Sequence, residues 1–173
     1  MLNPETISAV VILTIAAYID WKEHRVPNWL TFSAWGCGLA YHGLTGGWSG
    51  FQGSLAGSGV GLATLIIPYA LRGMGAGDVK LMAATGAWVG TGATLQAFLW
   101  IALAGGVMGL YAILRSREMK QRFETVWRAG LNLFQMQDLE TGAPVEKPAR
   151  ILLPYGVPIA FGFYAYFLFG GLI

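Results

Sequence analysis

Charged residues are scarce in this sequence. Only 12% of its 173 residues are Asp, Glu, Lys or Arg, whereas 55% are hydrophobic. A soluble domain carries a charge on about a quarter of its residues, so the composition excludes an ordinary soluble globular domain. Long runs without charge are typical of helices that cross a bilayer. We therefore treat lipid as the solvent around most of the chain.

Cysteine and histidine, two side chains that can bind metal ions, are also few. There is one cysteine, Cys37, and the two histidines, His24 and His42, lie far apart in the sequence. A single cysteine excludes a disulfide framework and a zinc site built from cysteines. We expect neither a metal nor a cofactor, and the small net charge of +2 gives no reason to expect a nucleic-acid partner.

The hydrophobic residues gather in six segments, which run over 4–19, 28–44, 51–71, 78–90, 93–114 and 151–173. Most of them approach the ~20 residues that are needed to cross the hydrocarbon core. No basic residue precedes the first segment, which favours a retained helix over a cleaved signal peptide. The predicted fold is all-α, a single domain over 1–173 built as a bundle of six transmembrane helices.

The basic residues fall on one side of this predicted bundle. All of them lie in 20–27, in 72–77 with Lys80 just beyond, or in 115–150, and none lies in the connections 45–50 and 90–92. Basic loops stay in the cytoplasm. We therefore expect the three charged loops in the cytoplasm and both termini outside.

Two further patterns concern packing. Apolar side chains recur at helical spacing over 119–134, which predicts an amphipathic helix that lies on the membrane surface or docks on the other loops. Gly53, Gly57 and Gly61 follow one another at intervals of four residues in the third segment. Such a small-residue face lets helices approach closely in lipid, and we expect it to serve packing within the chain.

Two acidic residues stand out because solvation does not explain them. Five of the nine acidic residues lie in the long loop, and Asp20 and Asp78 instead flank apolar segments at the same predicted edge of the membrane. Each alone could be a helix cap or an interfacial charge. Two neighbouring carboxyls, however, share a proton, so one can activate water while the other protonates a carbonyl oxygen. Their adjacency is not given by the sequence.

Three stretches together resemble the type IV prepilin peptidases. These are Gly75-Ala76-Gly77-Asp78 with Val79-Lys80-Leu81, which is similar to the GxGD signature of intramembrane aspartyl proteases; Asp20 followed by Arg25-Val26-Pro27-Asn28; and Pro154-Tyr155-Gly156-Val157-Pro158. The resemblance covers essentially the whole chain, and the three motifs keep the family's order.

The resemblance implies that Asp20 and Asp78 are the catalytic pair of an enzyme that removes the leader peptide from prepilin-like precursors at the cytoplasmic face of the membrane. The implied partners are the prepilin and the lipid bilayer. The compact chain resembles the peptidases of tight-adherence (Tad/Flp) pili, with archaeal preflagellin peptidases as another small branch. Because the chain has no cytoplasmic region with paired cysteines, peptidase activity without methyltransferase activity is expected.

The remaining motif residues are expected to support substrate binding or the local backbone. Glycine at 75 and 77 permits unusual torsions or a close approach of another chain, Lys80 either binds a substrate carboxylate or extends toward the interface, and Asn28 is expected to cap the helix that it opens. The full set is Gly75, Gly77, Lys80, Arg25, Pro27, Asn28, Pro154 and Gly156.

Two other functions fit the same residues. A small transporter or channel subunit could use the two aspartates as a proton or cation site, because ionisable groups within a membrane commonly serve transport. The second of these alternatives, and the third hypothesis in all, is a noncatalytic assembly scaffold.

Overall fold

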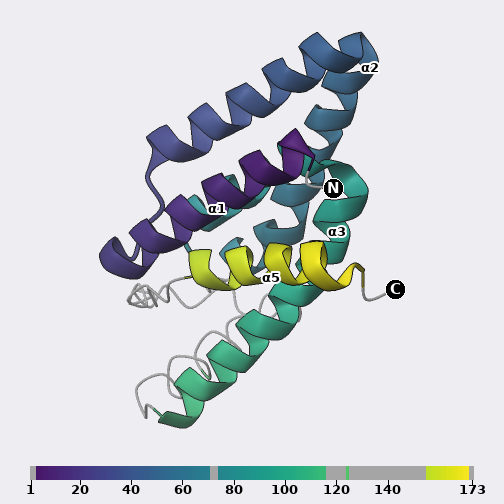
Figure 1. The fold of residues 1–173 in the computed structure, drawn as a ribbon. Coiled ribbons are helices and arrows are strands. Elements are labelled where there is room, and N and C mark those ends of the chain that lie inside the picture. Colours follow the sequence, from purple (N-terminus) through teal and green to yellow (C-terminus); the bar gives the residue numbers. More distant parts are fainter. Residues whose placement is uncertain (1–2, 71–73, 116–123, 125–154, 172–173) are drawn as a thin grey trace, which may run out of the picture.

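The structure, a computed structural model, describes residues 3–70, 74–115, 124 and 155–171. In this part of the chain every regular element is helical: α1 (Pro4–Glu23), α2 (Asn28–Ala70), α3 (Ala76–Arg115) and α5 (Gly156–Phe169) (Figure 1). The all-α class is confirmed. The amphipathic helix expected over 119–134 lies, apart from Glu124, outside the described residues.

Glycine divides both long helices. α2 has 43 residues, which in one straight helix would extend about 65 Å, roughly twice the thickness of the hydrocarbon core. The backbone leaves the helical region at Gly47 (φ 60°, ψ −148°) in α2 and at Gly90 (φ 81°, ψ 177°) in α3. Glycine adopts such torsions at little cost. The breaks fall inside the connections predicted at 45–50 and 90–92, and α2 folds back on itself (Figure 1).

The first helix is longer than predicted. The loop was expected to begin at Asp20, but α1 continues to Glu23. His24 then takes up a left-handed conformation (φ 51°, ψ 35°), and its backbone N–H donates to the carbonyl oxygen of Asp20 at 2.8 Å. This left-handed ending satisfies one of the last free carbonyls of a helix. As a result, Asp20 belongs to the last full turn of a helix and not to a loop.

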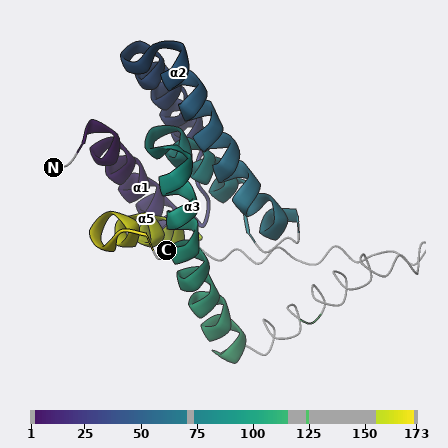
Figure 2. The ribbon, with the colours of Figure 1, turned by 90° about the vertical axis from the view of Figure 1, so that its right-hand side faces the viewer.

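The centre of the molecule is α3. It packs along α2 and also contacts α1 and α5, whereas α1 and α2 touch only slightly. The two perpendicular views agree in placing α3 between α2 and α5 (Figures 1 and 2). The interior is apolar, and its fully buried members are Leu13, Ala16, Leu81, Met82, Ala97, Ile159 and Phe163.

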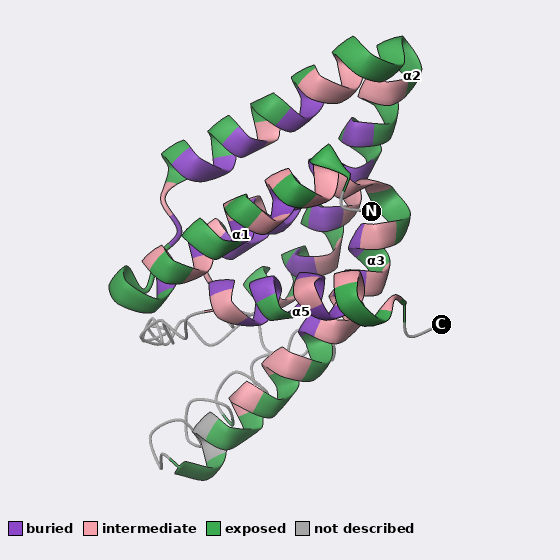
Figure 3. Ribbon diagram, in the orientation of Figure 1, coloured by how far each residue is buried: buried purple, intermediate pink, exposed green. Residues whose placement is uncertain are grey.

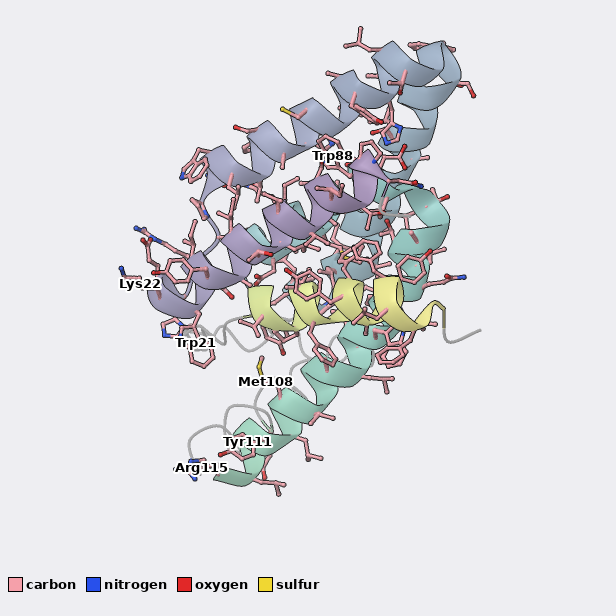
Figure 4. All side chains as sticks on the ribbon, in the orientation of Figure 1. Trp21, Lys22, Trp88, Met108, Tyr111 and Arg115 are labelled. Atoms are coloured by element: carbon pink, nitrogen blue, oxygen red, sulfur yellow. The ribbon has the colours of Figure 1, made fainter. Side chains whose placement is uncertain are left out.

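The outer faces of the helices are apolar as well. α1, α2 and the part of α3 over Ala76–Tyr111 are long and apolar enough to cross a membrane. Each of these helices has an exposed face (Figure 3). Large apolar side chains are among the exposed residues, where water would disfavour them and lipid does not. Met108, Tyr111 and Arg115 lie on the part of α3 that extends beyond α5 (Figure 4). The protein is therefore a membrane protein with several spanning helices.

Polar side chains join α2 to α3 inside the bundle. The indole N–H of Trp88 donates to the carbonyl oxygen of Ala34 at 2.8 Å, and Trp88 lies beside the first half of α2 (Figure 4). In the second half, the Ser54 hydroxyl donates to the carbonyl oxygen of Ala87 at 2.6 Å. Side-chain hydrogen bonds between helices contribute about 0.6 kcal/mol each on average in membrane proteins. They therefore fix the register of the helices more than they fix total stability.

Close backbone contact accompanies these bonds. A side chain at Gly57 would collide with the backbone of Gly86 and Gly90 in α3, and one at Gly61 would collide with the backbone of Met82. Nothing lies within 4 Å of the corresponding position at Gly53. The expectation that the small-residue face packs within the chain is thus confirmed for two of its three members.

Replacing Gly57 by alanine is predicted to lower the free energy of unfolding by about 1–3 kcal/mol, because the added methyl overpacks the contact with α3. Gly59 of the same helix has open space around it, so Gly59→Ala should raise the stability by roughly 0.5–1 kcal/mol through helix propensity. Thermal unfolding in detergent measures both. Equal effects of the two variants would contradict the packing described for Gly57.

Candidate active site

Asp20 is buried at the cytoplasmic end that the sequence predicts for α1. Only 3% of the residue is exposed. Its carboxylate oxygen Oδ2 accepts a hydrogen bond from the backbone N–H of Gly156 at 2.7 Å. Gly156 is the first residue of α5, and backbone N–H groups at the start of a helix lack partners within the helix and carry partial positive charge. Thus α5 supplies to Asp20 the donor that water would otherwise supply.

The contact with Asp20 explains why residue 156 is glycine. A Cβ atom at this position would lie 2.9 Å from both Cβ and Oδ2 of Asp20, which is closer than such atoms approach. The start of α5 can reach the carboxylate only because position 156 has no side chain. The structure thus brings together Asp20 and Gly156, two residues that the motifs singled out separately.

Asp78 occupies the first turn of α3 and is 5% exposed. Its Oδ2 accepts the backbone N–H of Gly75 at 3.0 Å, and its own backbone N–H donates to the carbonyl oxygen of Gly75 at 3.2 Å. An acidic side chain that reaches back from the third helical position to the N-cap N–H forms half of a capping box. Asp78 therefore helps to cap α3 from within the first turn, and the capping role does not compete with its burial in the site.

The two aspartates lie within electrostatic range of each other. The charge of Asp20 acts on the carboxyl of Asp78, and the helices that carry the two residues, α1 and α3, are in contact. Two like charges in a medium of low polarity repel strongly, and a carboxyl pair in this situation lowers its energy by sharing one proton. A pair that shares a proton in this way holds one carboxylate and one carboxylic acid.

The loop between α1 and α2 lies against the start of α3. A Cβ atom at Gly77 would be 3.0 Å from the carbonyl oxygen and 3.1 Å from the Cβ of Val26. Gly77 is itself helical, since α3 begins at Ala76. Gly77 therefore permits the close approach of Val26, and Gly75 provides the N–H that Asp78 accepts.

Lys80 joins α3 to the first turn of α2. Its Nζ donates to Oδ1 of Asn28 at 2.9 Å and lies 5.1 Å from the ring centroid of Phe32. A cation over an aromatic ring contributes about 0.5–1 kcal/mol where it is exposed. Helix α2 begins at Asn28, as predicted, and the side-chain oxygen of Asn28, which was expected to cap this helix, accepts a hydrogen bond from Lys80 of α3. The ammonium thus holds the two helix starts together.

The other predicted supporting residues lie farther from the carboxylates. Arg25 pairs with Glu23 at 3.4 Å, and the two side chains are 79% and 49% exposed, a setting in which an ion pair contributes little. Pro27 accepts the backbone N–H of Thr31 at 3.4 Å in the first turn of α2. Pro154 lies outside the described residues. Neither of these two bonds reaches Asp20 or Asp78.

Sequence reasoning gave no role to two residues that border the site. Val26, 7% exposed, packs on Gly77; an apolar residue between Arg25 and Pro27 in an otherwise polar loop was the available signal. Tyr155 is half-buried next to Gly156, and the charge of Asp78 acts on its hydroxyl. Among the described residues, no three His, Cys, Asp or Glu side chains gather where they could hold a metal ion.

Comparison with known proteins adds an independent line of evidence. The "Prepilin leader peptidase/N-methyltransferase" of Burkholderia pseudomallei (strain 1026b) is 34% identical over 113 residues, which cover 61% of this chain and 35% of that protein. The protein of the same name from Aeromonas hydrophila is 34% identical over 111 residues, 60% of this chain and 38% of that protein. The chain thus matches little more than a third of the length of these relatives. No solved structure matches it.

The comparison with family models covers the site directly. The model of the type IV leader peptidase family matches residues 7–110, an interval that includes both aspartates, the loop at Val26 and the turn at Gly75. The match extends over more than half of the sequence. The chain belongs to the type IV leader peptidase family.

Proposed function

We propose that this protein is a membrane aspartic endopeptidase that removes the leader peptide from prepilin-like precursors. The observation that carries the proposal is the buried pair Asp20 and Asp78, held at the ends of two helices by one backbone N–H each. Family membership and the printed names of the relatives support the substrate class. The family match gives no support to a transporter.

A shared proton suits the pair to peptide hydrolysis. The carboxylate takes a proton from water as the water oxygen attacks the carbonyl carbon of the scissile bond. The carboxylic acid protonates the carbonyl oxygen, and a proton then passes to the leaving nitrogen as the C–N bond breaks. The names of the relatives combine a peptidase activity and a methyltransferase activity. The carboxylate pair accounts for the peptidase activity, because carboxylates can activate water without a second substrate.

The same proposal includes the arrangement in the membrane. If Gly47 and Gly90 each mark a turn at the outer surface, then α2 and α3 contribute two crossings apiece, and with α1 and α5 the chain crosses six times. The distribution of Lys and Arg supports a cytoplasmic position for the C-terminal end of α1 and the start of α3. In this arrangement the protein lies in a bacterial inner membrane, both termini are outside and the site faces the cytoplasm. The compact chain suits a Tad/Flp pilus system.

Asp20→Asn and Asp78→Asn should each abolish leader removal from a co-expressed prepilin, with a fall of about 10²–10⁴-fold in rate, because neither amide can exchange a proton in the reaction. Immunoblots that separate precursor from mature pilin measure this. Glu23→Gln is the matched control, since Glu23 is an exposed acid one turn from Asp20, and it should process normally. Processing by either aspartate variant would contradict the pair.

Gly156→Ala should lower the cleavage rate by about 10²-fold, because its methyl displaces Asp20 and a small displacement of a catalytic group has an effect of that size. The purified enzyme and a prepilin peptide in detergent provide the measurement. Gly106→Ala is the control, since nothing lies within 4 Å of that position. Full activity in Gly156→Ala would show that the contact between α5 and Asp20 is dispensable.

The membrane arrangement can be checked by labelling single cysteines in a Cys37→Ser background. A cysteine at Lys22 should react with an impermeant thiol reagent only after the cells are opened, whereas one at Gly46 should react in cells whose outer membrane alone is permeable. Identical accessibility of the two positions would contradict a cytoplasmic site.

A further inference from the structure

Tyr155 lies beside the candidate active site and has no part in the mechanism given so far. It is the residue immediately before Gly156, whose N–H binds the Asp20 carboxylate. Its backbone is fixed in the helical region (φ −70°, ψ −17°), and its carbonyl oxygen accepts the N–H of Ile159 at 3.1 Å. The position of the residue is therefore set by the same contact that brings α5 to Asp20.

The side chain of Tyr155 extends from α5 toward α3. Its ring atom Cε1 lies 3.5 Å from the place where a side chain at Gly105 would begin, so the ring packs beside this glycine of α3. The charge of Asp78 acts on the phenol. Tyr155 is thus a half-buried residue at the contact between α5 and α3, and its neighbour in sequence holds Asp20.

We propose that the Tyr155 hydroxyl is a third catalytic group, which donates a hydrogen bond to the carbonyl oxygen of the scissile peptide bond as the tetrahedral intermediate forms. This inference rests on the proposed peptidase function. A phenylalanine at position 155 could pack against Gly105 equally well, so this packing does not explain why the residue carries a hydroxyl. The hydroxyl is a hydrogen-bond donor, and the carbonyl oxygen of a peptide bound beside Asp20 and Asp78 is an acceptor for it.

The step needs no change in the protonation of the tyrosine. The water oxygen bonds to the carbonyl carbon, its proton goes to the carboxylate, and the carbonyl oxygen receives the proton of the acid partner. Throughout, the phenol keeps its own proton, as expected for a group with an ordinary pKa near 10, and stabilises the charge that develops on the oxygen. Removing one donor of this kind lowers kcat by about 10²–10³-fold in enzymes where it has been done.

The first test is kinetic and compares Tyr155→Phe with Tyr166→Phe. Tyr166 is a half-buried tyrosine of the same helix that packs on Phe167. The first variant should lose about 10²-fold in kcat with KM changed less than twofold and an unchanged thermal midpoint, while the second keeps the activity of the wild type. Unchanged kcat in Tyr155→Phe would overturn the proposal. So would a loss confined to KM, or one that follows a lowered midpoint, because either would show a binding or structural role.

The second test does not depend on activity. In protein labelled with ¹³C at the ζ carbon of tyrosine, the resonance that disappears in Tyr155→Phe should shift in Asp78→Asn and stay in place in Glu23→Gln. An unmoved resonance in Asp78→Asn would place the phenol out of reach of the site and overturn the proposal. If Asp20→Asn and Asp78→Asn are inactive while Tyr155→Phe is fully active, this inference fails and the proposed function stands. If the wild type cleaves no prepilin, the proposed function fails and the catalytic role of Tyr155 fails with it.

Discussion

The structure depends on how two carboxylates are solvated where there is little water. Removing an ion from water costs several kcal/mol even after the protein relaxes, and each aspartate here recovers part of that cost from one backbone N–H at the start of a helix. That requirement fixes where α3 and α5 begin. Asp78 receives its donor from its own helix start, whereas Asp20, at the other end of its helix, needs a donor from a different helix.

Glycine makes these arrangements sterically possible, and each of the glycines involved contacts a different part of the molecule. Gly156 lets a helix start touch a carboxylate, Gly77 lets a helix start touch the loop at Val26, and Gly57 lets two helices touch backbone to backbone. In each case a neighbouring group lies where a side chain would begin, and this contact positions the site or the helices around it. Lys80, through Asn28, adds a polar bond to the contact at Gly77. The loop, α2 and α3 are thereby held at one point near Asp78.

Local features were predictable from the sequence, and contacts between distant segments were not. The breaks at Gly47 and Gly90 follow from the lengths of the apolar runs and from glycine, and the common depth of Asp20 and Asp78 follows from hydropathy. The end of α1 was placed too early because Asp20 looks like an interfacial charge, while the helix ends one turn later at a left-handed His24. The bond between Asn28 and Lys80 was not expected, because the two residues are 52 positions apart and no local pattern reveals such a bond.

The bond between Asp20 and Gly156 also has a consequence for biogenesis, because it joins residues 136 positions apart. A ribosome that adds about 5–20 residues per second needs roughly 7–27 s between the two. During that interval α2 and α3 are synthesised and can enter the bilayer after α1, while Asp20 still lacks the donor that α5 brings. The nascent chain is therefore unable to assemble the candidate site until α5 is inserted.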